Sequence, residues 1–149
     1  DDDASIMIRM NNNAKGNLSI SQVATGQENN FSISIYGDKG ALHWTQENPN
    51  YARFSKVGCA DQIITRGGTI QNKNSYAPIR IPPGHPEGYL EGFAQIYSDV
   101  ADVILDHKDK SELLKLLPSG ESGLQIMKFI NASVNSSKNN SVWTTLNSI

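Results

Sequence analysis

The fold class is decided by Phe31 to Thr45, FSISIYGDKGALHWT, because this stretch resembles two strands joined by a tight turn. Apolar side chains at positions 31, 33 and 35 alternate with serines and a tyrosine, and Asp38-Lys39-Gly40 then precedes a second strand-like run. Strict alternation interrupted by turn residues is typical of antiparallel strands connected by hairpins. The stretch therefore predicts a β-hairpin.

The same alternation continues on both sides of this hairpin. Upstream, Ser5–Met10 and Leu18–Ser21 flank an Asn- and Gly-rich turn, and downstream Tyr51–Val57 and Gln62–Arg66 are weaker strand candidates. Together they predict a meander of about five or six short strands.

Two helices are expected in the second half. The first follows Pro86, and the second follows an N-cap at Ser119 with Glu121 in its first turn. Their apolar stripes are Tyr89, Phe93, Ile96, Val100, Val103 and Ile104, and then Leu124, Met127, Ile130 and Val134. A closing strand is expected over Val142–Leu146. Strands followed by helices, without βαβ alternation, predict an α+β fold with an open, largely antiparallel sheet and helices on one face.

Composition excludes several classes of protein. The 149 residues suit one domain. The 13 Lys+Arg against 15 Asp+Glu leave a net charge of -2, so the chain lacks the excess of positive charge that binds a nucleic-acid backbone. The sequence has no apolar run long enough for a membrane span, no signal-like start and a single cysteine, Cys59, so we expect a cytoplasmic chain with no membrane partner and no internal disulfide. Because it opens with Asp1-Asp2-Asp3, we expect a piece of something longer.

Motifs for several chemistries are missing from the sequence. It has no Gly-x-Gly-x-x-Gly, no phosphate-binding loop and no Gly-x-Ser-x-Gly. None of His43, His85 and His107 has a second histidine two or four positions away, so no metal site is predicted.

The segment Gly84–Tyr89, GHPEGY, is the candidate site. It places an imidazole, a carboxylate and a phenol, those of His85, Glu87 and Tyr89, in one stiff loop where they could orient a small ligand. The alternative is structural: His85 caps the helix, Glu87 complements its dipole and Tyr89 begins its apolar stripe. Spacing alone favours the structural alternative.

The outward residues of the first strands are small. Ser19, Ser21, Ser32 and Ser34 form either an ordinary wet face or a flat face that docks on another sheet.

Three segments carry a resemblance to a known family. Tyr36–Pro49, Arg80–Ala94 and Ser122–Ile130 resemble, in the same order, "GxKGxLxWxQExP", "RxPxGHPEGYxEAFA" and "DGLxxMxFI" of the glucose–fructose oxidoreductase, inositol dehydrogenase and rhizopine-catabolism (Gfo/Idh/MocA) family. The middle match is the most specific of the three.

The resemblance implies that residues 1–149 are a single C-terminal substrate-binding and oligomerisation domain without the N-terminal Rossmann domain. The parent would oxidise or reduce a sugar or polyol with NAD or NADP, which the missing domain would bind. No catalytic or cofactor-binding residue of the family falls in this chain. His85 would face the substrate, Glu87 and Tyr89 would support its loop, and the serine face would form a homo-oligomer. The competing hypothesis is a stand-alone β-sheet binding or assembly module without redox activity.

Overall fold

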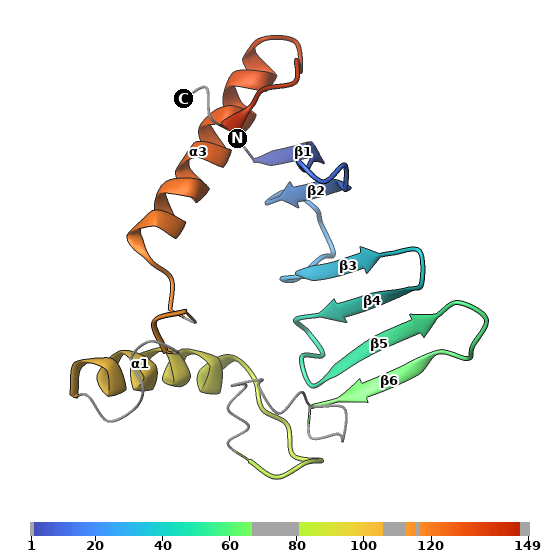
Figure 1. The fold of residues 1–149 in the computed structure, drawn as a ribbon, viewed down its shortest axis with the longest axis vertical. Coiled ribbons are helices and arrows are strands. Elements are labelled where there is room, and N and C mark those ends of the chain that lie inside the picture. Colours follow the sequence, from blue (N-terminus) through green and yellow to red (C-terminus); the bar gives the residue numbers. More distant parts are fainter. Residues whose placement is uncertain (1, 67–80, 106–112, 116, 147–149) are drawn as a thin grey trace. The chain divides into compact units, whose positions relative to one another are not determined.

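The structure, a computed structural model, describes residues 2–66, 81–105, 113–115 and 117–146. The chain divides into two compact units, Gly26–Ala101 and the combination of Asp1–Thr25 with Asp102–Ile149, and each is described by itself. Figure 1 labels the helices and strands of both units. All strand pairs are antiparallel and both sheets are open, which confirms the predicted α+β class. The six strands belong to a two-stranded and a four-stranded sheet.

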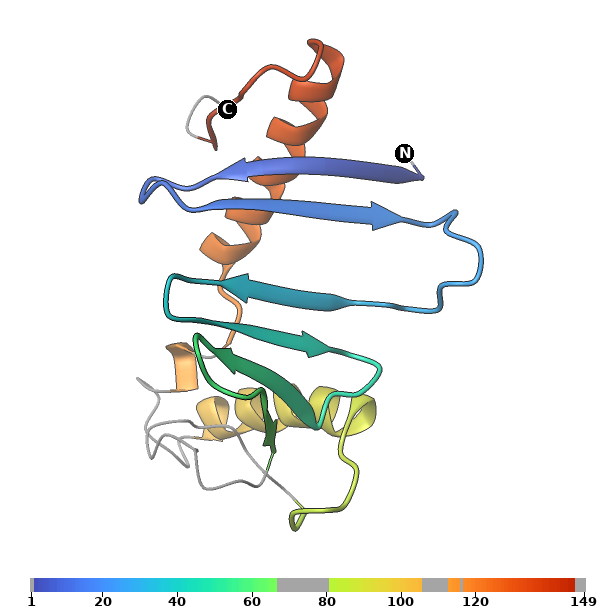
Figure 2. The same cartoon turned by 90° about the vertical axis from the view of Figure 1, so that its right-hand side faces the viewer.

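The unit Gly26–Ala101 contains the four-stranded sheet (Figure 2). Its strands lie in chain order: β3 (Ser32–Tyr36), β4 (Gly40–Thr45), β5 (Tyr51–Lys56) and β6 (Gln62–Thr65). Ser32 pairs with Thr45 and Tyr36 with Ala41, so the hairpin predicted from Phe31–Thr45 is confirmed.

The pairing register separates an apolar from a polar face of this sheet, because residues that pair across antiparallel strands project to the same side. The apolar face carries Ile33, Ile35, Leu42, Trp44, Ala52 and Phe54. The polar face carries Ser32, Ser34, His43, Thr45 and Arg53. Trp44 is fixed further by a hydrogen bond from its indole Nε1 to the Pro49 carbonyl, at 3.0 Å.

The turn between β3 and β4 requires a glycine at position 40. A Cβ built on Gly40 would lie 2.6 Å from the carbonyl oxygen of Ser55 on the neighbouring strand. The Gly37 N–H donates to the Gly40 carbonyl at 2.8 Å and closes the turn, and the Val57 N–H donates to the Lys39 carbonyl at 3.1 Å and ties the turn to the end of β5.

The first predicted helix is confirmed as α1 (Tyr89–Leu105). Just before its first residue, the N–H of Gly88 donates to the Glu91 carboxylate at 3.0 Å, which satisfies one donor that a helix start leaves without a backbone partner. One turn further on, Gln95 donates to the buried Asp99 carboxylate at 2.6 Å.

The other unit holds the hairpin of β1 (Asp3–Arg9) and β2 (Lys15–Ser21), together with α3 (Gly120–Lys138). Alternate residues of β1 are partly buried, as its sequence pattern predicts. Ser119 is the N-cap of α3, and its hydroxyl accepts from the Ser122 N–H at 3.1 Å, so this predicted cap is confirmed.

The predicted closing strand over Val142–Leu146 is wrong. Residues 142–145 carry no regular secondary structure and residue 146 begins a 3-10 turn. Trp143 instead lies under the Arg9 guanidinium, 4.6 Å from the ring centroid, in a cation–π contact. Across the ranges that the structure describes, no helix combines the length and the apolar character needed to cross a membrane.

Candidate functional site

The candidate site is the loop that connects the sheet of the unit Gly26–Ala101 to α1, and its described part is Ile81–Gly88. Pro82, Pro83 and Pro86 fix φ at three positions and remove three backbone donors. Gly84 has a φ of +85°, a left-handed conformation that favours glycine. This composition gives the loop one bent conformation, with His85 directly after the bend.

Arg66, the first residue after β6, ties this loop to the sheet. Its Nη1 donates to the Ile81 carbonyl at 3.3 Å and its Nη2 to the His85 carbonyl at 2.9 Å. Nη1 also forms an ion pair with Oε2 of Glu87. The guanidinium therefore contacts the loop at its described beginning, its middle and its end.

Asn50, the residue before β5, completes this arrangement. Its side-chain Oδ1 accepts from Arg66 Nε at 3.0 Å and from the Glu87 N–H at 3.2 Å. Its backbone carbonyl accepts from the Arg66 N–H at 3.1 Å, which extends the β5–β6 ladder by one pair. Asn50 and Arg66 are thus paired with each other through their backbones and hold the loop through their side chains.

Glu87 points toward Arg66 and not toward solvent. Its side chain is 9% exposed and that of Arg66 is 19% exposed, so the ion pair is largely removed from water. A carboxylate in such a place is stabilised by its cationic partner and costs several kcal/mol if that partner is lost. The structure places Glu87 as a support of the loop, and contact with a substrate stays a prediction.

His85 is exposed, and its hydrogen bonds determine which ring nitrogen is available. Both its N–H and its ring Nδ1 lie 3.3 Å from the Pro82 carbonyl oxygen. A carbonyl only accepts, so Nδ1 carries a proton, and in the neutral ring the lone pair resides on Nε2. This ring bonds to the loop through Nδ1, and contact of Nε2 with a substrate stays a prediction.

Tyr89 begins α1 and is 71% exposed. Its ring lies against that of Phe93, one turn along, with centroids 4.9 Å apart and planes tilted by 57°. The contact supports the structural part of its predicted role, since aromatic pairs in this range stabilise a helix face.

Arg66 and Asn50 are not among the residues that the sequence indicated. Position 66 ends a weak strand and position 50 follows a proline turn, so each fits a structural role. No local spacing connects positions 50, 66 and 87. The only local signal was at Arg66, which is an isolated arginine next to the turn-rich segment that follows it.

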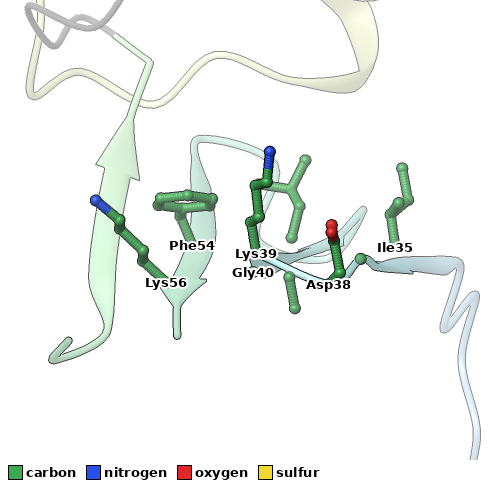
Figure 3. A pocket seen from close by; sticks show the side chains of 9 residues that line it. Ile35, Asp38, Lys39, Gly40, Phe54 and Lys56 are labelled. Carbon is green, nitrogen blue, oxygen red and sulfur yellow. The ribbon is translucent and has the colours of Figure 1, made fainter. Parts of the chain in front are cut away.

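A second candidate is a depression of about 390 Å³ at the turn between β3 and β4. Figure 3 shows the Phe54 ring between the side chains of Lys56 and Lys39, with Asp38 and Ile35 farther along. None of its lining residues belongs to the Ile81–Gly88 loop. The depression is lined by the ends of β3, β4 and β5 and by the turn between β3 and β4, so it is separate from the loop that carries His85.

The remaining histidines do not join the site. His43 lies on the polar face of the sheet, where its Nδ1 is 2.8 Å from the Ser34 hydroxyl, and His107 lies outside the described residues. Within the described ranges, no group of three or more His, Cys, Asp and Glu side chains could hold a metal ion.

Comparisons with known proteins match nearly the whole chain. Residues 1–146 match the family described as "Oxidoreductase family, C-terminal alpha/beta domain". The uncharacterized oxidoreductase YfiI of Bacillus subtilis (strain 168) is 28% identical over 147 residues, which are 96% of this chain and 37% of that protein.

Two solved structures extend this likeness to the fold. An oxidoreductase from Sinorhizobium meliloti is 42% identical, with a TM-score of 0.80 over 89% of this chain and 36% of its own. An inositol dehydrogenase homolog from Azotobacter vinelandii, complexed with NADH and myo-inositol, is 26% identical, with a TM-score of 0.85 over 96% of this chain and 38% of its own.

The chain thus spans less than two-fifths of the length of each of these relatives. The match reaches from the first strand to the end of the described residues, and the open antiparallel sheets with helices agree with the fold that the resemblance implied. The chain belongs to the Gfo/Idh/MocA oxidoreductase family and corresponds to its C-terminal α/β domain.

Proposed function

We propose that this chain is the substrate-binding domain of a nicotinamide-dependent oxidoreductase that acts on a sugar or polyol. The observation that carries the proposal is His85, whose Nε2 is offered from a loop anchored to the sheet by Arg66. Support for a polyol comes from the Azotobacter vinelandii relative, which was crystallised with myo-inositol and NADH.

The loop fits a small polyhydroxylated ligand on chemical grounds. An imidazole lone pair accepts a hydrogen bond from a hydroxyl group, and a rigid loop keeps it in place without a large entropic cost on binding. His85 in this proposal binds a hydroxyl of the substrate and contributes to substrate affinity. We assign no catalytic group to the chain.

The chain's own residues do not fit a nicotinamide site. The sequence lacks the glycine-rich turn that lets a backbone approach a pyrophosphate, and Arg66, the cation beside the described loop, is already bonded to Glu87 and two carbonyls. We therefore place the nicotinamide outside these 149 residues and leave NAD or NADP open.

We propose further that the serine-lined strand faces mediate a homo-oligomer. Ser19 and Ser21 share one face of β2, and Ser32 and Ser34 share one face of β3; all four are exposed. Small uncharged side chains allow a second sheet to approach to roughly 10 Å. The partner that we propose for these faces is a second copy of this chain.

The test of the enzymatic proposal uses protein expressed from the complete reading frame that carries the chain. It is incubated with NAD or NADP and with a panel of polyols and sugars that includes myo-inositol, and reduced nicotinamide is followed by absorbance. We expect reduction that depends on the polyol and none with the 149-residue chain alone. Absence of reduction with every polyol and both cofactors would contradict the proposal.

A further inference from the structure

We propose that Arg66 is a positioning residue: it holds the Ile81–Gly88 loop closed so that His85 presents Nε2 to a hydroxyl of the substrate. The inference rests on the proposed function and deepens it, because it names the side chain on which the binding geometry depends. Arg66 itself contacts the loop and not the ligand.

The Arg66 guanidinium bonds to the loop on both sides of its bend. The carbonyls of Ile81 and His85 flank the bend made by Pro82, Pro83 and Gly84, and Arg66 bonds both, at 3.3 and 2.9 Å. One rigid planar group thus spans the bend. The contact of His85 Nδ1 with the Pro82 carbonyl lies inside the bend and depends on its closure.

Position 66 needs the planar fork of an arginine side chain. Three loop groups and Asn50 Oδ1 are contacted from Nε, Nη1 and Nη2, in different directions within the plane of the guanidinium. A lysine ammonium is a single point donor on a flexible stem and cannot reproduce this fork. Arg66→Lys therefore keeps the charge opposite Glu87 and loses the clamp on the two carbonyls.

Without Arg66, the two hydrogen bonds that His85 keeps among the described residues are both to the Pro82 carbonyl, so they lie within the loop itself. Asn50 still accepts from the Glu87 N–H, which holds the end of the loop but not its bend. We expect the bend to open and the His85 ring to lose its fixed proton position.

The experiment uses the ¹⁵N-labelled 149-residue chain and reads the ring nitrogens of His85 by NMR. The main variant is Arg66→Met/Glu87→Gln, which removes both members of this ion pair and so does not leave the Glu87 carboxylate facing an apolar side chain. The matched control is Arg53→Met/Asp61→Asn, which removes an ion pair of 3.4 Å whose side chains are 53% and 51% exposed.

Wild type and control should show one tautomer, with the proton on Nδ1. The Arg66→Met/Glu87→Gln chain should show averaged tautomers of the His85 ring. Arg66→Lys should show the same averaging, and it replaces the double variant in the experiment if the double variant does not fold. In a titration with myo-inositol, the affinity should fall by about three- to ten-fold in both Arg66 variants and stay within two-fold in the control, because a misplaced His85 loses part or all of one hydrogen bond, which is about ten-fold in affinity.

The inference is overturned if a folded Arg66 variant keeps the wild-type ring signals and the wild-type affinity for myo-inositol. If the wild-type chain binds no myo-inositol, that result counts against the proposed polyol substrate. The ring signals then decide the positioning role alone: averaged tautomers in the variants support it, and unchanged ones refute it.

Discussion

Removing Arg66 should destabilise the unit Gly26–Ala101 far more than removing an exposed arginine does. The Glu87 carboxylate has a side chain only 9% exposed, and Arg66→Met leaves it without this cation. Loss of one partner of a buried ion pair costs about 3–5 kcal/mol. We expect the free energy of unfolding to fall by an amount in that range.

Adding Glu87→Gln to Arg66→Met should raise the free energy of unfolding again. Glu87→Gln removes the charge that Arg66→Met leaves behind, so the double variant should be more stable than Arg66→Met alone, by about 1–3 kcal/mol. Arg53→Met, on the exposed pair with Asp61, should cost less than about 1 kcal/mol.

The assay is urea unfolding followed by tryptophan fluorescence in a Trp143→Phe background, because Trp44 then reports on its own unit. The midpoint and slope give the free energy of unfolding for each variant. The reasoning is refuted if Arg66→Met costs no more than Arg53→Met, or if adding Glu87→Gln lowers the stability further.

Three other outcomes are expected. Gly40→Ala should lower the free energy of unfolding by about 1–3 kcal/mol, because its Cβ meets the Ser55 carbonyl. Gly92→Ala in α1, where an added Cβ has nothing within 4 Å, should raise it by about 0.5–1 kcal/mol. Urea unfolding measures both variants, and equal effects would contradict the stated cause. Ser19→Lys/Ser32→Lys should dissociate a dimer or tetramer in light scattering, and a monomeric wild type would remove the serine face as an interface. The 149-residue chain should show no affinity for NADH in a fluorescence titration, and saturable binding would place a nicotinamide site within it.

Local patterns were sufficient for most of the fold. The alternation over Phe31–Tyr36 reports which side chains share a sheet face, and Ser119 ahead of an apolar stripe reports a helix start, since both signals arise within a few residues. Val142–Leu146 has the residue types of a strand but no strand pairing, and the Trp143 ring meets Arg9 instead. Strand propensity without a partner does not make a sheet.

The candidate site was only partly accessible from sequence, for the same reason. GHPEGY is contiguous, so His85, Glu87 and Tyr89 could be identified together. The residues that hold the motif are 21 and 37 positions away from Glu87, as the numbering of Arg66 and Asn50 shows. Their meeting follows from the β5–β6 pairing, which sets Asn50 opposite Arg66, and that register is a tertiary property.

The most direct test of the account is the kinetic effect of His85→Leu, which removes the acceptor nitrogen, in protein made from the complete reading frame. Loss of one hydrogen bond of about 1.4 kcal/mol corresponds to about ten-fold in affinity. We predict that KM for the polyol rises by about that factor, while KM for the nicotinamide and kcat stay within about two-fold. An unchanged polyol KM would contradict the account, and so would a kcat lowered a thousand-fold, which would make His85 a catalytic group instead of a binding one.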